Sequence, residues 1–298
     1  MCGIAGLFDP AREPTRFPRE HVQAMSDAVV HRGPDEGGLH LEPHVALAHR
    51  RLSIIDLASG QQPLFNEDGS VVVVFNGEIY NFQELTRELE AAGHRFHTRS
   101  DTEVIVHAWE QWGERCVERF RGMFAFALWD RNRRTLFLAR DRLGVKPLYY
   151  AFLRDGTLAF GSELKSFKVL GQFDRVISDA AVEEYFAFGY VPDPKTIYRN
   201  AFKLPPGFTL VFRVGDRAPS LRQYWDIGFE PRQSLSLADA VDDLRERLRE
   251  AVRIRLIAEV PLGAFLSGGV DSGTVVALMA GLLDQPVKTC SIGFDKPE

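Results

Sequence analysis

The chain begins with Met1-Cys2-Gly3-Ile4-Ala5-Gly6-Leu7-Phe8, a cysteine followed by small and apolar residues. Residues 3–8 are typical of a buried strand, which would hold Cys2 at the edge of a sheet with its thiol facing a cleft. If Met1 is removed, Cys2 carries a thiol and a free α-amine, which titrate near pH ~8.5 and ~8 respectively. The amine can then activate the thiol as a nucleophile. The alternative is that a small second residue merely permits removal of Met1.

A second informative stretch is Phe75-Asn76-Gly77-Glu78-Ile79-Tyr80-Asn81, which follows a run of apolar residues from 71 to 75. Consecutive apolar residues predict a strand buried on both faces, as between stacked layers, and this strand is expected to end at Asn76. An Asn amide beside a Gly N–H offers two fixed donors for an oxyanion. Asn-Gly also favours a hairpin turn, but a helix over residues 82–92 is predicted next, with Asn81 as its cap.

Charged residues beside apolar ones mark two further candidate positions. Arg50 and Arg51 interrupt the predicted strand within residues 45–55, and an arginine among apolar residues needs a carboxylate partner. The stretch Ser100-Asp101-Thr102-Glu103 reads as a capping box that opens a helix over residues 102–112. Asp101 would then be free at the first helical turn, where a carboxylate stays ionised and suits an ammonium ligand.

The breaker cluster His31-Arg32-Gly33-Pro34-Asp35 ends a helix predicted for residues 19–30. We interpret His31 as structural, because the α-amine of Cys2 already supplies a base. Short strands are predicted at residues 124–130, 135–140, 148–152 and 158–160, and the charged segment 140–147 is expected to hold the ends of the sheet strands. We estimate that a first domain ends near residue 210 and that a different kind of sheet follows it. The proline-rich residues 191–207 would form the connector.

Beyond the connector, the sequence predicts a long amphipathic helix over residues 237–256 and then one βαβ unit. Its strands cover residues 260–266 and 287–294, and its helix covers residues 273–283. The intervening loop is Ser267-Gly268-Gly269-Val270-Asp271-Ser272, whose glycines allow backbone N–H groups to approach an anion at a helix N-terminus. The loop lacks Gly-Lys-Ser/Thr and is therefore not a Walker loop.

Composition bounds the class of protein. With 298 residues, 45% hydrophobic and 26% charged, the sequence is typical of a globular protein with room for two domains. The longest aliphatic run is too short to cross a bilayer, and no secretory signal precedes Cys2. The cysteines Cys2, Cys116 and Cys290 form neither a disulfide framework nor a metal knuckle, which favours a reducing cytoplasm. The net charge of -5 without a basic run does not imply a nucleic-acid partner.

Taken together, these motifs resemble the glutamine-hydrolysing asparagine synthetase family. The resemblance joins a class II glutamine amidotransferase head to a pyrophosphate-loop synthetase domain, and it is greatest to a bacterial branch associated with exopolysaccharide and PEP-CTERM protein-sorting clusters. It implies an α+β fold over residues 1–210, an N-terminal-nucleophile αββα sandwich of two stacked antiparallel sheets. Residues 211–298 would hold the connector and the start of an α/β parallel-sheet adenine-nucleotide-binding domain. The motifs are Cys2-Gly3-Ile4, His31 to Asp35, Arg51-Leu52-Ser53-Ile54, Phe75 to Asn81, Ser100 to Glu103, Arg140 to Gly144 and Ser267 to Ser272.

The resemblance also implies roles for residues of the head. Cys2 would attack the carboxamide carbon of glutamine, with its α-amine as base, while Asn76 and the Gly77 N–H hold the oxyanion. Arg51 would pair with the substrate α-carboxylate, and Glu78 and Asp101 with its α-ammonium. The backbone of four residues would line the pocket: Leu52, Ser53, Ile54 and Ile55.

In the second domain the resemblance implies ATP with Mg²⁺, and no permanently bound metal. ATP would activate a carboxylate as an acyl-adenylate, and ammonia arriving through a tunnel would displace AMP, turning aspartate into asparagine. The family resemblance also implies a homodimer in the cytoplasm, with no membrane partner. The residues that would contact the nucleotide are Leu266, Ser267, Gly268, Gly269, Asp271, Ser272 and Ile292.

The sequence ends at Glu298 inside an α/β unit, so we expect a fragment of a longer protein with exposed apolar surface after about residue 230. Three functions stay open: an asparagine synthetase, an amidotransferase of the same architecture acting on another carboxylate, and a non-catalytic relative. A fourth, the same head on a sugar-phosphate or phosphoribosyl-pyrophosphate enzyme, is disfavoured by the Ser267–Ser272 loop. Retention of Met1 would block the amine and favour the non-catalytic reading, which intact mass can detect.

Overall fold

The computed structural model describes residues 1–13, 16–230 and 235–293, and the predicted first strand lies near the middle of a sheet. This strand, β1 (Gly3–Phe8), pairs antiparallel with β3 (Val45–Arg51) on one side and β9 (Leu158–Gly161) on the other. The sheet has six strands in the order β10-β8-β9-β1-β3-β2. The other three are β2 (Glu36–Glu42), β8 (Tyr149–Phe152) and β10 (Ala201–Lys203).

A second six-stranded sheet has the order β12-β11-β7-β6-β5-β4, with β5 (Val71–Ile79) paired to β6 (Gly122–Asp130). The prediction that this strand ends at Asn76 is wrong. Asn76 and Gly77 continue the ladder, and a Cβ added at Gly77 would lie 2.2 Å from the Met123 carbonyl oxygen. Asn-Gly is therefore not a turn here. The remaining strands are β4 (Leu64–Phe65), β7 (Thr135–Arg140), β11 (Phe208–Arg213) and β12 (Ser220–Gln223).

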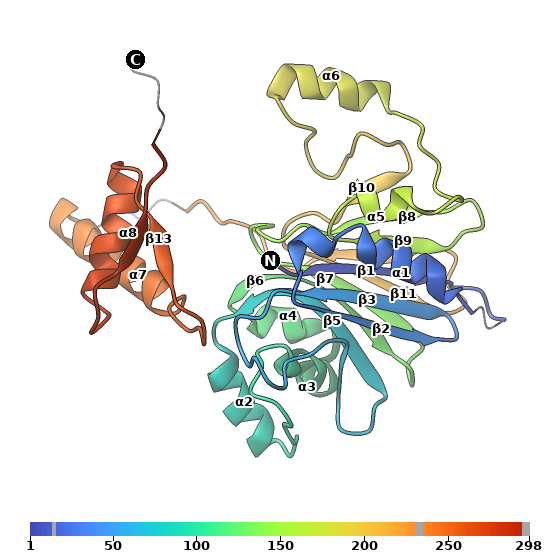
Figure 1. Ribbon diagram of the computed structural model, residues 1–298, viewed down its shortest axis with the longest axis horizontal. Coiled ribbons are helices and arrows are strands. Elements are labelled where there is room, and N and C mark those ends of the chain that lie inside the picture. Colours follow the sequence, from blue (N-terminus) through green and yellow to red (C-terminus); the bar gives the residue numbers. More distant parts are fainter. Residues whose placement is uncertain (14–15, 231–234, 294–298) are drawn as a thin grey trace. The chain divides into compact units, whose positions relative to one another are not determined.

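The two sheets stack and share a core, which confirms the predicted sandwich of two antiparallel sheets. Ile4 and Phe8 from β1 meet Val72 and Val74 from β5 in one buried cluster, because alternate side chains of each strand face the other sheet. Helices cover the outer faces (Figure 1). The helix α1 (Arg19–Asp27) and the 3₁₀ turn η1 (Val30–Arg32) lie on the first sheet, and the second is covered by α2 (Phe82–Ala91), α3 (Glu103–Trp112), η2 (Gly113–Arg115) and α4 (Cys116–Arg119).

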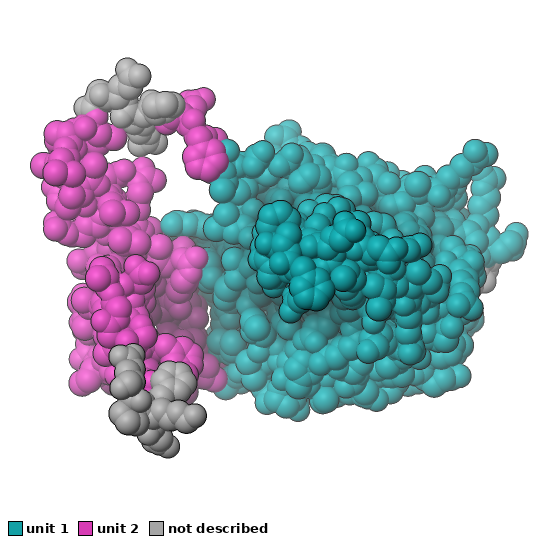
Figure 2. Space-filling model, turned by 90° about the horizontal axis from the view of Figure 1, so that it is seen from above, with its two compact units in different colours: residues 1–227 teal, residues 228–298 magenta. Residues whose placement is uncertain are grey.

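The proline-rich segment is part of this sandwich and not a connector. It follows α5 (Lys165–Lys168) and α6 (Asp179–Phe188) and contains β10, which pairs with β8. The Arg140 guanidinium donates to the Leu204 carbonyl at 2.7 Å, and the Gly207 N–H donates to the Asp141 carbonyl at 2.9 Å. The first compact unit accordingly runs to Ile227, past the expected boundary at residue 210, which falls inside β11 (Figure 2).

Two predicted helix caps differ from the structure. Asn81 precedes α2, but its side chain donates to the Arg119 carbonyl at 3.0 Å and accepts the Arg121 N–H at 2.9 Å. Glu103 opens α3 without a capping box, since its carboxylate accepts the N–H groups of His97 and Thr98 at 2.7 Å each. In both cases a neighbouring segment brings backbone partners that local sequence spacing does not reveal.

The second unit, Gly228–Glu298, contains the predicted βαβ element. Strand β13 (Gly263–Phe265) pairs parallel with β14 (Lys288–Cys290), and α8 (Val270–Ala280) connects them. Ahead of them α7 (Leu237–Arg253) is capped by the Ser236 hydroxyl. As expected, apolar side chains here are exposed, including Phe265 at 75%. The predicted strand end at Phe294 lies outside the described residues, and no helix among the described residues is long and apolar enough to cross a membrane.

Candidate active site

Cys2 directly precedes β1 in one sheet, and Asn76 lies in β5 of the other sheet. Ile4 and Val74 point into the core between the sheets, and alternation places Cys2 and Asn76 on those same inward faces. The Cys2 sulfur accepts the Leu52 N–H at 3.4 Å and lies 3.7 Å from the Leu52 carbonyl oxygen. The thiol therefore sits at the end of the sandwich, where β3 leads into a loop.

The segment from His31 to Asp35 holds both Cys2 and this loop. The Arg32 side chain donates to the Cys2 carbonyl at 2.9 Å and pairs with Glu163 at 3.1 Å. His31 lies 2.8 Å from the same Glu163 carboxylate, a supporting contact that agrees with its structural interpretation. The Asp35 carboxylate accepts the Ser53 N–H at 2.9 Å. These contacts fix the nucleophile and the opposite wall of the pocket together.

The Asn76 amide is buried without a partner. Its side chain is 1% exposed, and neither its nitrogen nor its oxygen forms a hydrogen bond with any described residue. Leaving a buried amide unsatisfied costs about 1–3 kcal/mol, so such a group is expected where a ligand completes it. The strand that carries Asn76 is fixed by His49 of β3, whose ring donates to the Phe75 carbonyl at 3.0 Å; burial lowers the pKa of His49 to about 3, which keeps the ring neutral.

A small pocket, open to solvent, lies beside Cys2. Predicted site residues supply most of its wall, while Ser53 and Asn76 are not part of its lining. Gly60, Gln62, Phe75, Ser100 and Thr102 also line it and were not predicted as site residues, because loop and strand pairing bring them there. The predicted residues in the wall are Cys2, Arg51, Leu52, Ile54, Ile55, Gly77, Glu78 and Asp101.

Arg51 is the buried cation of this pocket. Its guanidinium pairs with Glu36 at 3.1 Å and donates to the carbonyls of Ile55 at 3.2 Å and Asp56 at 2.6 Å. These bonds fix the plane of the guanidinium, as a site for a carboxylate requires. A Cβ at Gly60 would lie 2.6 Å from it, so a side chain there would displace it. Arg50, in contrast, pairs with Asp27.

Glu78 and Asp101 form a pair of carboxyl groups in the same wall. Asp101 accepts the Ile79 N–H at 2.8 Å, yet burial raises its pKa to about 6. Burial, together with the charge of Asp101, raises the pKa of Glu78 to about 8. Desolvation therefore outweighs the helix dipole in setting the pKa of Asp101, and a carboxyl group with this pKa is still mostly ionised at neutral pH. A cationic ligand would favour the ionised form of both groups.

Lys146 is a charged residue of the site that sequence reasoning missed. It is 5% exposed, and burial lowers its pKa, an effect that the nearby Glu78 carboxylate opposes. Its charge also acts on the amino terminus. The segment 140–147 does hold a strand end, as the Asp141 N–H donates to the Phe124 carbonyl at 2.8 Å and the Asp141 carboxylate accepts the Phe124 N–H at 3.1 Å. The sequence signal that could have identified it was a lysine between Val145 and Pro147, directly after the motif Arg140 to Gly144.

The protonation of Cys2 depends on its amino group. Burial raises the pKa of the Cys2 thiol, so the sulfur needs a base to become a nucleophile. Met1 is 57% exposed, and its removal would leave a free amine on the same residue. Burial lowers the pKa of the present amino terminus, which favours a neutral amine able to accept a proton.

The second unit arranges its predicted nucleotide residues around one loop. Gly268 has φ +82°, and Gly269 precedes α8, so the loop reaches the helix N-terminus through a left-handed residue. The hydroxyls of Ser267 and Ser272 lie 3.0 Å apart, and the Leu266 N–H donates to the Cys290 carbonyl at 2.9 Å. Asp271 is in the first turn of α8, and Ile292 is exposed beyond β14. The residues present suit a phosphate group at this helix end.

Known proteins resemble the chain in both parts. The family described as a glutamine amidotransferase domain matches residues 1–225, and the family described as asparagine synthase matches residues 243–298. Asparagine synthetase [glutamine-hydrolyzing] 1 of Bacillus subtilis is 39% identical over 99% of this chain and 46% of that protein. Amidase chry2 of Gibberella zeae is 36% identical over 97% of this chain and 44% of that protein. The chain thus spans about half the length of these relatives.

A solved structure supports the fold. The glutamine phosphoribosylpyrophosphate amidotransferase of B. subtilis, in complex with ADP and GMP, aligns with a TM-score of 0.53 at 17% identity, over 97% of this chain and 65% of that one. At this identity the likeness bears on the fold alone. With three quarters of its length matched by one family, the chain belongs to the glutamine amidotransferase domain family, and its remaining residues match asparagine synthase.

Proposed function

We propose that this protein hydrolyses glutamine at Cys2 and supplies the ammonia to an ATP-dependent amidation of a carboxylate. The observation that carries the proposal is the unpartnered, buried Asn76 amide, next to Gly77 in the wall of the pocket that Cys2 also lines. A fixed arginine and a pair of carboxyl groups in the same wall complement an α-amino acid. Arg51 would bind its carboxylate, and Glu78 with Asp101 would bind its ammonium group.

The chemistry follows from this arrangement. The α-amine of Cys2, freed by removal of Met1, takes the thiol proton as the sulfur attacks the carboxamide carbon. The negative charge moves to the amide oxygen, where the Asn76 side chain and the Gly77 N–H donate to it. The protonated amine then gives its proton to the leaving nitrogen, which departs as ammonia and leaves a thioester. Water hydrolyses the thioester to glutamate and restores the thiol.

The second half of the proposal concerns the acceptor. Residues 266–272 offer N–H groups and hydroxyls for the phosphates of ATP, with Asp271 available for the accompanying Mg²⁺. Aspartate is the acceptor that the names of several relatives suggest, yielding asparagine, AMP and diphosphate. A different carboxylate is the second candidate, since other relatives at similar identity are named amidases. A thiol nucleophile also fits a reducing cytoplasm, and a homodimer is proposed by family resemblance.

Two assays test this function. Purified chain should release glutamate from glutamine, and intact mass should show that Met1 is absent; a protein without Met1 that leaves glutamine unchanged would overturn the glutaminase assignment. For the acceptor, the protein is given ATP, Mg²⁺, glutamine and one carboxylate at a time, and diphosphate release is followed. Release that depends on aspartate supports asparagine formation, and release with another carboxylate only would replace aspartate.

Arg51→Lys should chiefly weaken glutamine binding. A lysine keeps the charge but cannot reproduce the planar fork, and losing one charge-assisted hydrogen bond of about 1.5–3 kcal/mol raises KM by roughly 10–100-fold. The measurement is steady-state kinetics of glutamate release, with kcat expected near its original value. Arg50→Lys is the matched control, because Arg50 pairs with Asp27 and should leave KM unchanged. A fall in kcat at constant KM would indicate that Arg51 stabilises the transition state and does not contribute to ground-state binding of glutamine.

Binding of glutamine should also depend on the ionisation of Glu78. Its pKa is raised to about 8 in the unliganded protein, so the carboxyl is neutral at lower pH and attracts the substrate ammonium only as pH rises. We expect the dissociation constant of glutamine, measured calorimetrically on Cys2→Ala to avoid turnover, to rise as pH falls from about 8 to about 6. Glu78→Gln should bind more weakly and flatten this dependence. An unchanged slope in Glu78→Gln would contradict the assignment.

The stability of the unliganded protein should show the opposite trend. Between the unfolded pKa of a glutamate, about 4.3, and the folded value, the native state binds more protons than the unfolded state. The contribution of Glu78 to the free energy of unfolding is therefore present at low pH and falls as pH rises toward about 8. Thermal unfolding at several pH values should show a smaller fall for Glu78→Gln.

A further inference from the structure

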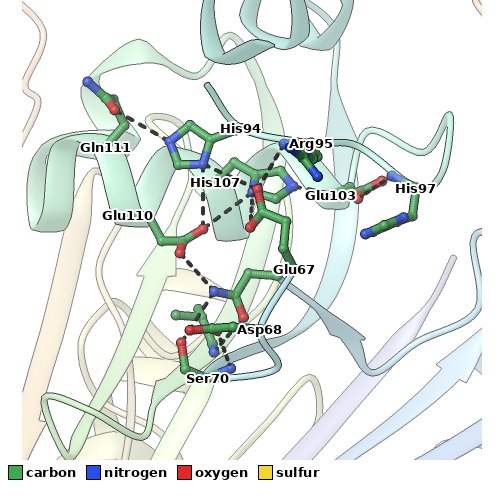
Figure 3. Close-up of polar contacts among 12 residues, drawn as sticks. Glu67, Asp68, Ser70, His94, Arg95, His97, Glu103, His107, Glu110 and Gln111 are labelled. Atoms are coloured by element: carbon green, nitrogen blue, oxygen red, sulfur yellow. Dashed lines mark hydrogen bonds and ion pairs between the residues drawn. The ribbon is translucent and has the colours of Figure 1, made fainter. Parts of the chain in front are cut away.

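A second cluster of titratable side chains lies in the first unit, outside the Cys2 pocket. It consists of Glu67, His94, His107 and Glu110 (Figure 3). Glu67 is in the turn between β4 and β5, His94 follows α2, and the other two residues are one turn apart on α3. The four side chains converge from three segments that are distant in sequence.

The candidate ligand atoms of the four side chains lie close together. Each pair lies within 4.8 Å. The His94 Nδ1 atom is 3.7 Å from both Glu67 Oε1 and Glu110 Oε2, while the His107 Nδ1 atom is 3.4 Å from Glu67 Oε2 and 3.3 Å from Glu110 Oε2. Ligands at about 2.0–2.2 Å from a tetrahedral zinc ion are roughly 3.3–3.6 Å apart. Small side-chain movements would therefore complete a coordination shell.

Atoms of three of these side chains form hydrogen bonds outside the cluster, which is a separate observation. The second ring nitrogen of His94 lies 3.4 Å from Gln111 Oε1, while that of His107 is buried 3.5 Å from Glu103 Oε1 without a hydrogen bond. Histidines that bind metals are commonly oriented in this way by an acceptor at the far nitrogen. The carboxylates are held too: Glu110 Oε1 accepts from the Asn66 amide at 2.8 Å, and Glu67 Oε1 accepts the Arg95 N–H at 2.8 Å.

We propose that Glu67, His94, His107 and Glu110 bind one divalent transition-metal ion, with Zn²⁺ as the preferred ion. Two imidazoles and two carboxylates form a ligand set that zinc accepts in tetrahedral geometry. Four protein ligands leave no open position, so the role is structural. His107 is fully buried, whereas the side chains of Glu67 and Glu110 are 30% and 28% exposed, which leaves a path for entry.

The metal would join the β4–β5 turn, the segment after α2, and α3. Glu103, which faces His107, also accepts the N–H groups of His97 and Thr98, in the segment that leads to Asp101. The ion would thus brace the segment carrying one carboxyl of the candidate glutamine site. The sequence analysis expected no resident metal from the family resemblance and no metal knuckle from the cysteine spacing, and this site contains no cysteine.

The alternative is a proton in place of the metal. Although burial lowers it, the adjacent carboxylates of Glu103 and Glu110 raise the pKa of His107 to about 9. A charged His107 bridging these carboxylates would give the same geometry without any ion. The two states differ in metal content and in their response to chelators.

The test uses the 298-residue chain, purified without a histidine tag and dialysed after addition of Zn²⁺. We expect about one zinc per chain by elemental mass spectrometry, visible bands of tetrahedral Co²⁺ after exchange, and a lower Tm after a chelator. Glu110→Gln and His94→Gln should lose both the metal and the chelator effect. His97→Gln is the matched control, since His97 is exposed on the same segment and its ring lies outside the cluster (Figure 3).

The outcomes separate the two states. The proposal is overturned if wild-type protein retains no zinc and its Tm does not change when a chelator is added. That result would indicate that a proton on His107 holds the cluster together. If Glu110→Gln and His94→Gln retain as much zinc as wild type, Glu110 and His94 are not zinc ligands. Gln111→Ala removes only the outer partner of His94 and should weaken zinc binding by about 10-fold, the lower end of typical effects of such partners. Because these variants carry substitutions at partly exposed positions, the test does not depend on folding of a His107 variant.

Discussion

Cys2→Ala is expected to abolish glutamine hydrolysis while the fold stays intact. The thiol is the nucleophile of the proposed reaction, and the pocket hydroxyls of Ser100 and Thr102 are already engaged with the Thr102 N–H and the Gln62 amide. The lost side chain makes only weak sulfur contacts with Leu52, so the change in the free energy of unfolding should be about 1 kcal/mol or less. Glutamate release and thermal unfolding measure the two effects.

The control for this variant is Cys290→Ala. Cys290 is an exposed thiol in the second unit, and its removal should leave glutaminase activity unchanged. Glutamate release above background by a clean Cys2→Ala preparation would remove Cys2 from the reaction. Loss of activity accompanied by unfolding would instead show that Cys2 is needed for the strand edge.

Asn76→Ala is expected to lower kcat by about 10²–10³ with little change in KM, the usual effect of removing one oxyanion donor. Its effect on stability should be unusual. The amide has no hydrogen-bond partner among the described residues, so alanine removes a buried unsatisfied group and should keep or raise Tm. Kinetics of glutamate release test the expected fall in kcat, and thermal unfolding of the same preparation tests the expected unchanged or higher Tm.

Asn81→Ala is the matched control for this prediction. Asn81 follows the same strand, but its amide bonds to the Arg119 carbonyl and the Arg121 N–H. Its loss should lower Tm without a selective fall in kcat. If Asn76→Ala instead raised KM at constant kcat, Asn76 would contribute to ground-state binding, and the oxyanion donors would lie elsewhere.

The local pattern of apolar and polar residues was sufficient to predict many of the secondary-structure elements. The small apolar run after Cys2, the apolar run before Asn76 and the βαβ unit around the glycine loop form the predicted elements. Strand and helix periodicities depend on neighbours a few residues apart, so they can be read from the chain. The stacked antiparallel sheets followed from the family resemblance and are confirmed.

Long-range pairing decided where elements begin and end. β5 continues through Gly77 because β6 lies alongside it, and the proline-rich segment joins the sandwich because β8 and the Arg140 side chain bind it. The Asn81 side chain is not a helix cap for the same reason, because it binds the backbone of Arg119 and Arg121. Partners supplied by distant segments compete with local ones, and sequence spacing contains no information about them.

The residue types of the candidate site were determined by the sequence alone: a cysteine at position 2, a buried arginine, an Asn-Gly pair and two carboxyl groups. Their physical states were decided by the tertiary structure. Burial raises the pKa values of Glu78 and Asp101. Folding also brings Lys146 near Glu78 and leaves the Asn76 amide without a hydrogen-bond partner among the described residues. The convergence of Glu67, His94, His107 and Glu110 is likewise a product of folding, because desolvation and contact across distant segments exist only once the chain is packed.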